Sequence, residues 1–149
     1  MELDKILNDD LILLNVDCKN KDDILRIMSK KLLEYNFINN QEKFLEDVYN
    51  REKLGETGIG NYIAIPHGQS DSVIQTTICI AKLKNEIEWE SLDGNGVKVV
   101  ILFVVENNED FANSHLKLLT NVARKLSNSS TLENLLSANS KSDIKNCFV

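Results

Sequence analysis

The sequence predicts an α/β fold, a three-layer α/β/α sandwich with a mixed β-sheet of about four to five strands. Residues 97–105 are nearly all Val, Ile, Leu and Phe, and a strand that is apolar on both faces is usually central, with helices covering both sides. On either side of the strand region, apolar residues recur at the three- and four-residue spacing of amphipathic helices. The resulting order of elements, β-α-α-β-β-β-α-α-α, places the sheet between two helical layers.

The first part of the chain supplies one strand and two helices. Residues 11–16 are predicted as a short strand. Asn20 is a candidate cap for the first helix, with Asp23 as the acid of a capping box. Asn40 opens the second helix, which should end near residues 54–55 because glycine favours the left-handed position that follows a helix. The predicted inward residues are Ile24, Met28, Leu32 and Tyr35 on the first helix and Phe44, Leu45, Val48 and Tyr49 on the second.

Three further strands are predicted in the middle of the chain. Residues 63–65 alternate large apolar and small side chains and should form a strand that stops at Pro66, since proline cannot donate to the ladder. Residues 73–83 are rich in Val, Ile and Thr, which favour strands. The Asp-Gly-Asn-Gly turn at residues 93–96 then leads into the apolar strand at residues 97–105.

The last part of the chain is predicted to be helical. A long helix begins near Asn113 or Ser114, after a polar loop. Residues 130–133 and residues 140–143 each have the pattern of a capping box and open two shorter helices. The buried stripe predicted for the long helix is Leu116, Leu119, Ala123 and Leu126.

Length and composition indicate one domain, residues 1–149, with a hydrophobic content of 42%. The formal net charge of −6 argues against nucleic acid as a partner, because a phosphate backbone requires a basic surface. The three cysteines, Cys18, Cys79 and Cys147, lack a Cys-x-x-Cys pair, so neither a disulfide framework nor a zinc site is expected. The charged N-terminus, and no apolar run of about 18 residues, predict a cytoplasmic protein with no direct membrane insertion.

Residues 51–68 hold the only proline, four of the six glycines and one of the two histidines. Pro66 fixes the backbone before His67, and Gly68 permits a close approach by another molecule. The ordinary interpretation of such a histidine is a polar residue at the exposed end of a strand. A positioned imidazole near neutral pH can instead act as a base, a metal ligand or a nucleophile.

His115 and Arg51 are the other candidate site residues. His115 is predicted in the first turn of its helix, where free N–H groups favour an anion and a neutral imidazole; otherwise it is a half-covered residue at a helix start. The guanidinium of Arg51 suits phosphate oxygens, although a lone arginine is more often solvated. Together with His67 they indicate phosphoryl chemistry, and the chain has neither a His-Glu-x-x-His motif nor a Walker loop.

The segment from Arg51 to His67 contains Thr-Gly-Ile-Gly-Asn followed by Ile-Ala-Ile-Pro-His. It resembles the signature of the fructose/mannitol-type enzyme IIA domain of the bacterial phosphoenolpyruvate-dependent sugar phosphotransferase system. The resemblance extends through residues 87–94, the apolar strand and residues 115–119, and includes two C-terminal segments, so it covers nearly the whole chain. It implies the same sandwich that the residue patterns predict.

The resemblance further implies a metal-independent phosphotransferase component without a cofactor. The family carries a phosphoryl group on Nε2 of the histidine that matches His67. It receives the group from the phosphocarrier protein HPr and passes it to a cysteine of an enzyme IIB component, which links it to the membrane IIC transporter. His115 and Arg51 match the auxiliary histidine and arginine. The expected partner surface, apolar around His67, comprises Thr57, Ile59, Tyr62, Ile63 and Gly68.

Two alternatives stay open. In the nitrogen-related branch of the same family, the phosphorylation state governs binding to other proteins, so the chain would be a regulatory module. A metal-binding protein that uses both histidines is the other alternative, but no carboxylate or cysteine ligand is placed near them.

One position departs from the family pattern. Where the family usually has Gly-Asn-Gly before Ile-Ala-Ile-Pro-His, this chain has Gly60-Asn61-Tyr62. If the backbone there requires a positive φ, tyrosine is strained. If the position only requires space, Tyr62 reshapes the partner surface.

Overall fold

The computed structural model describes residues 3–108 and 111–149 and confirms a mixed α/β fold in three layers. The described residues form a six-stranded sheet, rather than one of four to five strands, in the order β1-β5-β6-β3-β2, with β4 pairing separately with β6. The pairs β1–β5, β3–β6 and β4–β6 are parallel, whereas β5–β6 and β2–β3 are antiparallel. The strands are β1 (Ile12–Val16), β2 (Gly58–Gly60), β3 (Ile63–Ala64), β4 (His67–Ser70), β5 (Thr77–Ile87) and β6 (Val97–Glu106).

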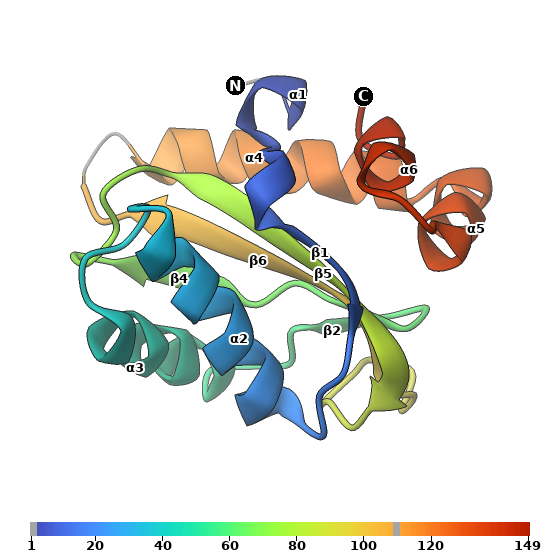
Figure 1. Ribbon diagram of the computed structural model, residues 1–149, viewed down its shortest axis with the longest axis horizontal. Coiled ribbons are helices and arrows are strands. Elements are labelled where there is room, and N and C mark those ends of the chain that lie inside the picture. The colour runs from blue at the N-terminus through green and yellow to red at the C-terminus, as the bar shows by residue number, and fades with distance from the viewer. Residues whose placement is uncertain (1–2, 109–110) are drawn as a thin grey trace.

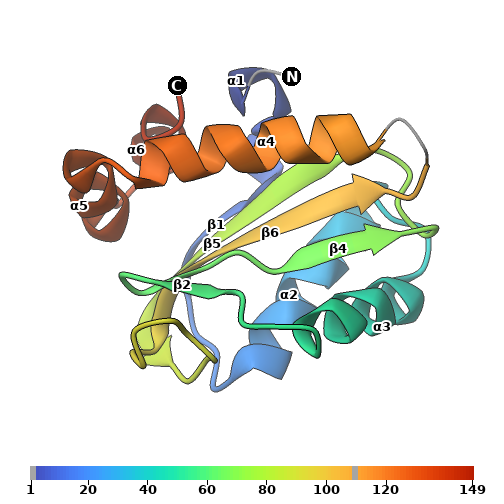
Figure 2. The same ribbon diagram turned by 180° about the vertical axis from the view of Figure 1, so that it is seen from behind.

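Helices cover both faces of the sheet (Figure 1). They are α1 (Leu3–Ile6), α2 (Lys21–Glu34), α3 (Gln41–Glu52), α4 (Phe111–Leu126), α5 (Ser129–Ser137) and α6 (Lys141–Asn146), with a short 3-10 helix, η1, at Asp9–Leu11. One face carries α2 and α3, and the other carries α4 together with α1, α5 and α6, as the view from behind also shows (Figure 2).

Strand β6 lies in the middle of the sheet and sends its side chains to both faces. The core beneath α4 receives Val99, Ile101, Phe103 and Val105. The core beneath α2 and α3 receives Val97, Val100, Leu102 and Val104. The prediction of a central strand that is apolar on both faces is confirmed.

Helices α2 and α3 begin at the predicted caps. Oδ1 of Asn20 accepts a hydrogen bond from the N–H of Asp23 (2.9 Å), and Oδ1 of Asn40 accepts one from the N–H of Lys43 (3.0 Å). These bonds satisfy donors that the first helical turn leaves without a partner. Of the predicted inward residues, Ile24, Met28, Leu32, Phe44, Leu45 and Val48 are buried, Tyr49 is partly buried, and Tyr35 is 43% exposed, so it was assigned to the core wrongly.

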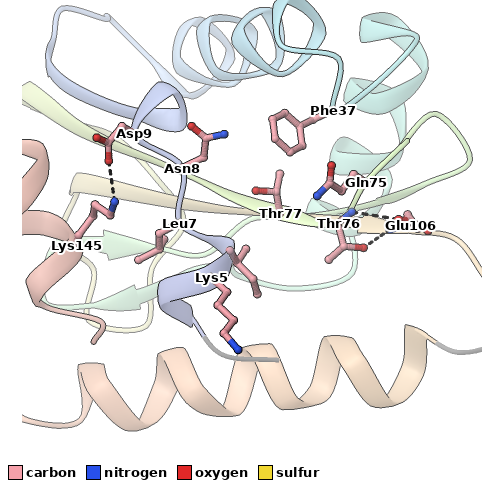
Figure 3. Close-up of a pocket in the computed structure, with 11 residues that line it drawn as sticks. Lys5, Leu7, Asn8, Asp9, Phe37, Gln75, Thr76, Thr77, Glu106 and Lys145 are labelled. Carbon is pink, nitrogen blue, oxygen red and sulfur yellow. Dashed lines mark hydrogen bonds and ion pairs between the residues drawn. The ribbon is translucent and has the colours of Figure 1, made fainter.

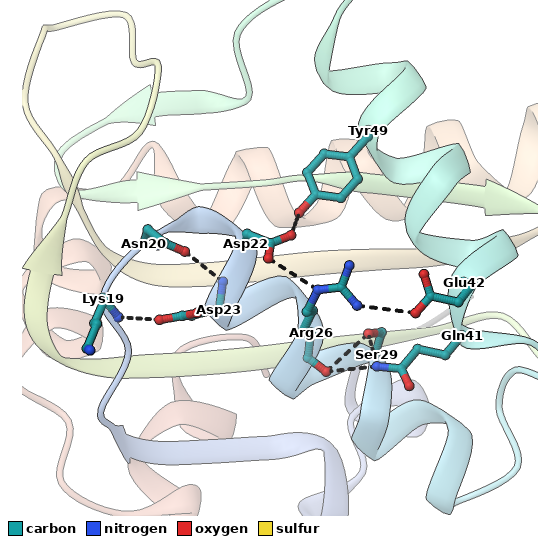
Figure 4. Close-up of polar contacts among 9 residues, drawn as sticks. All are labelled: Lys19, Asn20, Asp22, Asp23, Arg26, Ser29, Gln41, Glu42 and Tyr49. Carbon is teal, nitrogen blue, oxygen red and sulfur yellow. Dashed lines mark hydrogen bonds and ion pairs between the residues drawn. The ribbon is translucent and has the colours of Figure 1, made fainter.

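Polar side chains join α2 to α3 (Figure 4). The hydroxyl of Tyr49 donates to the carboxylate of Asp22. The guanidinium of Arg26 contacts the carboxylates of Asp22 and Glu42, each at 3.2 Å. The side-chain amide of Gln41 donates to the carbonyl oxygen of Arg26 at 3.2 Å. These contacts fix the orientation of α3, whose last turn carries a candidate site residue.

The C-terminal end of α3 differs from the prediction. The helix ends at Glu52, and Gly55 does not adopt the left-handed backbone that was expected of it. The N–H of Lys53 bonds to the carbonyl of Tyr49 at 3.1 Å and closes the last turn. Residues 53–56 then form an exposed loop that leads into β2.

The strand that was predicted to stop at Pro66 is interrupted there and then resumes. β3 and β4 both run parallel to β6, and β4 begins at His67. Pro66 has no N–H, but its carbonyl accepts a hydrogen bond from the N–H of Phe103 (3.0 Å), so the chain stays beside β6. His67 is therefore the first residue of a strand and not a residue beyond its end.

Two elements start at positions other than those predicted. β5 begins at Thr77 and not at residue 73, because the N–H of Val73 turns back to the carbonyl of Ser70 at 3.1 Å. α4 begins at Phe111, ahead of the expected start. Its buried stripe is Leu118, Val122 and Leu126, with Leu119 partly buried, whereas Leu116 and Ala123 are exposed.

The predicted cap is confirmed for α6 but not for α5. Ser140 caps α6, since its Oγ accepts a hydrogen bond from the N–H of Asp143 (3.0 Å). α5 is capped by Asn128, whose Oδ1 accepts from the N–H groups of Ser130 and Thr131 at 2.9 and 3.2 Å. The predicted capping box at residues 130–133 therefore lies inside the helix.

The hairpin of β2 and β3 turns at Asn61 and Tyr62. Their φ angles are 56° and 65°, and φ of Gly60 is 88°. Two consecutive positive φ angles define a type I′ turn, which favours Asn-Gly. The position of Tyr62 therefore does require a left-handed backbone. The tyrosine ring lies 4.3 Å from Nζ of Lys98, which partly offsets the strain.

Candidate active site

The three candidate residues come from three different elements. His67 opens β4, His115 lies in α4, and Arg51 lies in the last turn of α3. The centroids of the two imidazole rings are 5.2 Å apart, and the rings are nearly perpendicular, at 89°. The charge of Arg51 is close enough to lower the pKa of both histidines. The fold thus brings together residues that are far apart in the sequence.

Phe103 forms an apolar support beneath the two histidines. Its ring is stacked on that of His67, with centroids 5.3 Å apart, and meets that of His115 edge-on at 5.9 Å. Phe103 is itself fully buried, and it pairs with His67 in the β4–β6 ladder. The two imidazoles are therefore held against a rigid part of the core.

The Nε2 atoms of His67 and His115 are both buried, and neither has a hydrogen-bond partner among the residues that the structure describes. Buried polar atoms are nearly always hydrogen-bonded, so each exception requires an explanation. A polar group that reached these two nitrogens would give each of them the hydrogen-bond partner that it lacks.

Both imidazoles are neutral near pH 7. The pKa of His67 is lowered from 6.5 to about 4, chiefly by burial and further by His115 and Arg51. The pKa of His115 is also lowered, by burial first and then by Arg51. A neutral imidazole keeps a lone pair on one ring nitrogen, so it can act as a nucleophile at neutral pH.

The position of His115 corrects one part of the prediction. Because α4 begins at Phe111, His115 is its fifth residue and lies beyond the first turn. The field at a helix terminus acts within the first turn, so it does not account for the neutral state of His115. Burial and the neighbouring Arg51 account for it instead.

Arg51 is half-buried and does not project freely into solvent. Its Nη1 lies 3.4 Å from the carbonyl oxygen of Gly55, in the loop that follows α3. The guanidinium also influences both histidines electrostatically. It therefore lies where it can stabilise an anion bound between them.

Three residues of the expected partner surface lie behind the surface instead. Thr57 is 4% exposed, Ile63 is fully buried, and Gly68 is buried as well. The side chains of Thr57 and Ile63 are therefore not exposed for contact with a partner. Ile59, which is 37% exposed, and the half-buried Tyr62 do reach the surface.

Gly68 has a packing role that the sequence did not indicate. A Cβ atom at this position would lie 2.3 Å from the ring of Phe44 and 3.0 Å from a methyl of Val48. Both neighbours belong to α3. The glycine therefore allows α3 to approach β4 closely, which places the end of the helix near His67.

One residue that was predicted to be buried, Leu116, is an exposed apolar residue. Leu116 follows His115 directly and is 63% exposed. It had been assigned to the buried stripe because the register of α4 was taken incorrectly. The start of α4 at Phe111 does not by itself reveal that Leu116 is exposed. The side of α4 that is buried depends on how the helix lies on the sheet.

A cavity lies away from these residues (Figure 3). Its volume is about 670 Å³, and it is bounded by the N-terminal segment, Phe37, the start of β5 and Lys145. None of the predicted site residues lines it. Charges of both signs surround it, including Asp9, Glu106 and Lys145, so it does not select an obvious class of ligand.

Over residues 3–108 and 111–149, no group of three or more His, Cys, Asp or Glu side chains is arranged to hold a metal ion. Across the same residues, no helix is both long and apolar enough to cross a membrane.

Known proteins match this chain in sequence over nearly its whole length. The family model described as "Phosphoenolpyruvate-dependent sugar phosphotransferase system, EIIA 2" matches residues 5–149. The fructose-specific EIIABC component of Bacillus subtilis (strain 168) is 32% identical over 144 residues, or 97% of this chain. The chain spans 22% of the length of that protein. The mannitol-specific phosphotransferase enzyme IIA component of the same organism is 29% identical over 143 residues, 94% of each chain.

A solved structure matches the whole fold. The crystal structure of nitrogen regulatory protein IIA-Ntr from Neisseria meningitidis superposes with a TM-score of 0.87. The two sequences are 26% identical, and the match covers 98% of both chains.

Proposed function

The chain belongs to the EIIA 2 family of the phosphoenolpyruvate-dependent sugar phosphotransferase system, and from this membership we propose that it is a phosphocarrier with His67 as the carrier residue. The observation that carries the proposal is the buried Nε2 of His67, which has no partner among the described residues and belongs to a neutral ring beside His115 and Arg51. His67 accepts a phosphoryl group from HPr and passes it to a cysteine of an enzyme IIB component.

In the proposed transfer, each of the three site residues has one role. The lone pair on Nε2 of His67 attacks phosphorus in line, the N–P bond forms, and the bond from phosphorus to the donor breaks. The donor keeps that electron pair. Phosphoryl transfer depends mainly on alignment and on stabilising charge on the equatorial oxygens. Arg51 and a hydrogen bond from Nε2 of His115 supply that stabilisation.

The proposed partners are HPr, as donor, and enzyme IIB, as acceptor. The name of the fructose-specific relative, EIIABC component, combines A, B and C parts in one protein, which supports a IIB partner and, through it, a membrane IIC transporter. Ile59 and Leu116 are exposed apolar side chains available for such contacts. The role proposed for the chain is cytoplasmic, and it uses no metal, cofactor or nucleic acid.

A second function is supported by the match to nitrogen regulatory protein IIA-Ntr, which covers 98% of both chains. In that case the phosphorylation state of His67 controls binding to other proteins. Transfer from the phosphorylated chain to a purified IIB component supports the carrier role. Stoichiometric binding to a non-transport protein, altered by phosphorylation and without transfer, supports the regulatory role.

Labelling with phosphoenolpyruvate, enzyme I and HPr tests the carrier residue. The parent chain should acquire one acid-labile phosphate, and peptide mapping should place it on His67. The His67→Ala variant should remain unlabelled, with its fold confirmed by circular dichroism. Full labelling of a folded His67→Ala chain would refute the proposal.

A further inference from the structure

A polar cluster lies at the C-terminal end of α3, and its members Glu52, Thr57 and Trp89 are buried. The carboxylate of Glu52, only 6% exposed, contacts Nζ of Lys21 at 2.5 Å and accepts a hydrogen bond from Oγ1 of Thr57 at 2.9 Å. Oγ1 of Thr57 in turn accepts from Nε1 of Trp89 at 2.9 Å. Nζ of Lys21 also contacts Glu90 at 2.7 Å and lies 4.8 Å from the ring of Trp89. We call these five residues the Glu52 cluster.

The Glu52 cluster joins α2, the end of α3 with the loop that follows it, and the segment after β5. Lys21 opens α2, Glu52 closes α3, Thr57 precedes β2, and Trp89 follows β5. Further backbone bonds connect the same segments, since the N–H of Gly58 donates to the carbonyl of Glu90 at 3.1 Å. Such a cluster fixes the end of a helix that would otherwise fray.

The cluster is connected to both sides of the phosphoryl site. Glu52 is the direct neighbour of Arg51 on the last turn of α3. The carbonyl of Thr57 accepts a hydrogen bond from the N–H of Ile65 at 2.9 Å, two residues before His67. Thr57 therefore links the segment that carries the arginine to the segment that carries the histidine.

The charge of the Glu52 carboxylate must be offset if this group is to lie close to the phosphoryl site. A carboxylate next to a phosphoryl site repels the transferred group and competes for the arginine. Lys21, which is shared with the exposed Glu90, lies 2.5 Å from Glu52 and offsets part of its charge. One carboxylate oxygen is used by Lys21 and Thr57, while the other, Oε2, is buried without a partner among the described residues. Arg51 is left available for the substrate.

We propose that Glu52 and Thr57 are positioning residues for phosphoryl transfer, and that they act by holding the guanidinium of Arg51 at the distance from His67 that the transferring group requires. This inference rests on the proposed function. A flexible arginine must be ordered at each turnover, whereas one on an anchored helix end is already in place. Residues 53–56 are exposed, so the anchor at Thr57 compensates for a loop with little packing of its own.

Replacement of Thr57 tests the inference. Thr57→Val keeps the shape of the side chain but removes Oγ1, and it should slow phosphoryl transfer about 10- to 100-fold, as displacement of a positioning group does. Thr57→Ser keeps the hydroxyl and should restore most of the rate. Thr77→Val is the matched control. Thr77 is equally buried, but its Oγ1 has no partner among the described residues, so the parent rate is expected.

A double-mutant cycle identifies the group through which Thr57 acts. If Thr57 works through Arg51, then Arg51→Gln with Thr57→Val should be no slower than Arg51→Gln alone. Fully additive losses, or a parent rate in Thr57→Val, would overturn the inference. If Thr57→Val does not fold, Glu52→Gln, which has nearly the same volume, is used in the same cycle with the same expected loss of rate.

A titration of His67 by NMR in the unphosphorylated protein separates this inference from the proposed function. Arg51 contributes to the low pKa of His67. The pKa of His67 should therefore rise in Thr57→Val and return toward the parent value in Thr57→Ser. A pKa that is unchanged in Thr57→Val would refute the positioning role, whatever the phosphorylation assay shows. A raised pKa in a chain that is never phosphorylated would show that Thr57 holds Arg51 near His67, and it would reject the phosphocarrier function on which the role in transfer rests.

Discussion

The two helical layers each supply one residue to the site, Arg51 from α3 and His115 from α4, and the contacts that hold these helices differ. On one face, α2 and α3 lie side by side and are joined by the contacts Asp22–Tyr49 and Arg26–Glu42. On the other, α4 lies on the sheet through an apolar stripe that includes Leu118 and Val122. Both layers bury an apolar face against the sheet, and the first layer adds directed polar contacts between its two helices. His67 lies on the strand between them and receives one neighbouring group from each.

This difference determines what each layer can tolerate. Hydrogen bonds and ion pairs depend on direction and distance, so they fix the end of α3, and with it Arg51, in one place. Apolar packing is not directional, and its strength follows the area buried. Changes in the α4 layer should therefore affect stability in proportion to burial, whereas changes around the end of α3 should affect transfer more than stability.

The largest effect on stability is expected from a matched pair of leucines on α4. Leu118 is fully buried and Leu116 is 63% exposed. Leu118→Ala should lower the free energy of unfolding by about 2–5 kcal/mol, whereas Leu116→Ala should change it by less than about 0.5 kcal/mol. Urea unfolding of the two variants measures the difference. Equal losses would show that the register of α4 is not the one described.

The next prediction concerns His115, the residue that α4 supplies, and the rate of phosphoryl transfer. If His115 stabilises the transferring anion and is not the carrier, His115→Ala should still become labelled but should transfer more slowly. The loss of one fixed donor costs about 2.7–4 kcal/mol of barrier, or about 10²–10³ in rate. Quench-flow transfer to IIB measures it, with Arg51→Gln as the comparison from the other layer. A parent rate in His115→Ala would reduce this residue to a packing role.

The buried histidine between the layers should make stability depend on pH. The pKa of His67 is about 4 in the folded chain and 6.5 in the reference state. The unfolded chain therefore binds a proton first as the pH falls, so stability is complete above pH 6.5 and decreases between pH 6.5 and pH 4. The decrease due to His67 is up to about 3 kcal/mol.

The His67→Gln variant isolates that contribution. Acidic groups also lose native contacts in acid, so the parent and the variant are compared by urea unfolding at about pH 7 and about pH 4.5. The variant should lose less stability between the two conditions. Parallel losses in both chains would mean that His67 keeps an ordinary pKa in the folded state.

Local signals predicted the α2–α3 layer well. Asn20 and Asn40 cap their helices because a short amide side chain reaches the free N–H groups of the following turn. The apolar positions of both helices recur at a regular spacing, and all but Tyr35 are at least partly buried. A capping bond spans only three residues, so the sequence contains the information that determines it.

The α4 layer and the details of the site depend on tertiary contacts. Which side of α4 is buried follows from its placement on β5 and β6, so Leu116 and Ala123 were misassigned. His67 was recognised from its loop, but its place at the start of β4 depends on the bond between Pro66 and Phe103. Gly68 was interpreted as access for a partner, yet it provides room for Phe44. Sequence spacing does not specify contacts of this kind.

The smallest effect on stability is expected when a helix cap is removed, and each layer offers one cap for comparison. Asn40 caps α3 through one hydrogen bond, to the N–H of Lys43, and Asn128 caps α5 through two, to the N–H groups of Ser130 and Thr131. Asn40→Ala and Asn128→Ala should each lower the free energy of unfolding by about 1 kcal/mol. Their effects on function should differ, because only α3 carries a residue of the phosphoryl site.

Both variants are therefore measured by urea unfolding and by phosphoryl transfer. Asn128→Ala should transfer at the parent rate, since α5 lies on the α4 side and none of the site residues belongs to it. Asn40 lies at the opposite end of α3 from Arg51, so the polar contacts between α2 and α3 and the Glu52 cluster should protect the site even when the cap is lost. A parent rate in Asn40→Ala thus supports anchoring of Arg51 at the C-terminal end of the helix. Slow transfer in this variant alone would show that the whole of α3, and not its last turn, positions the arginine.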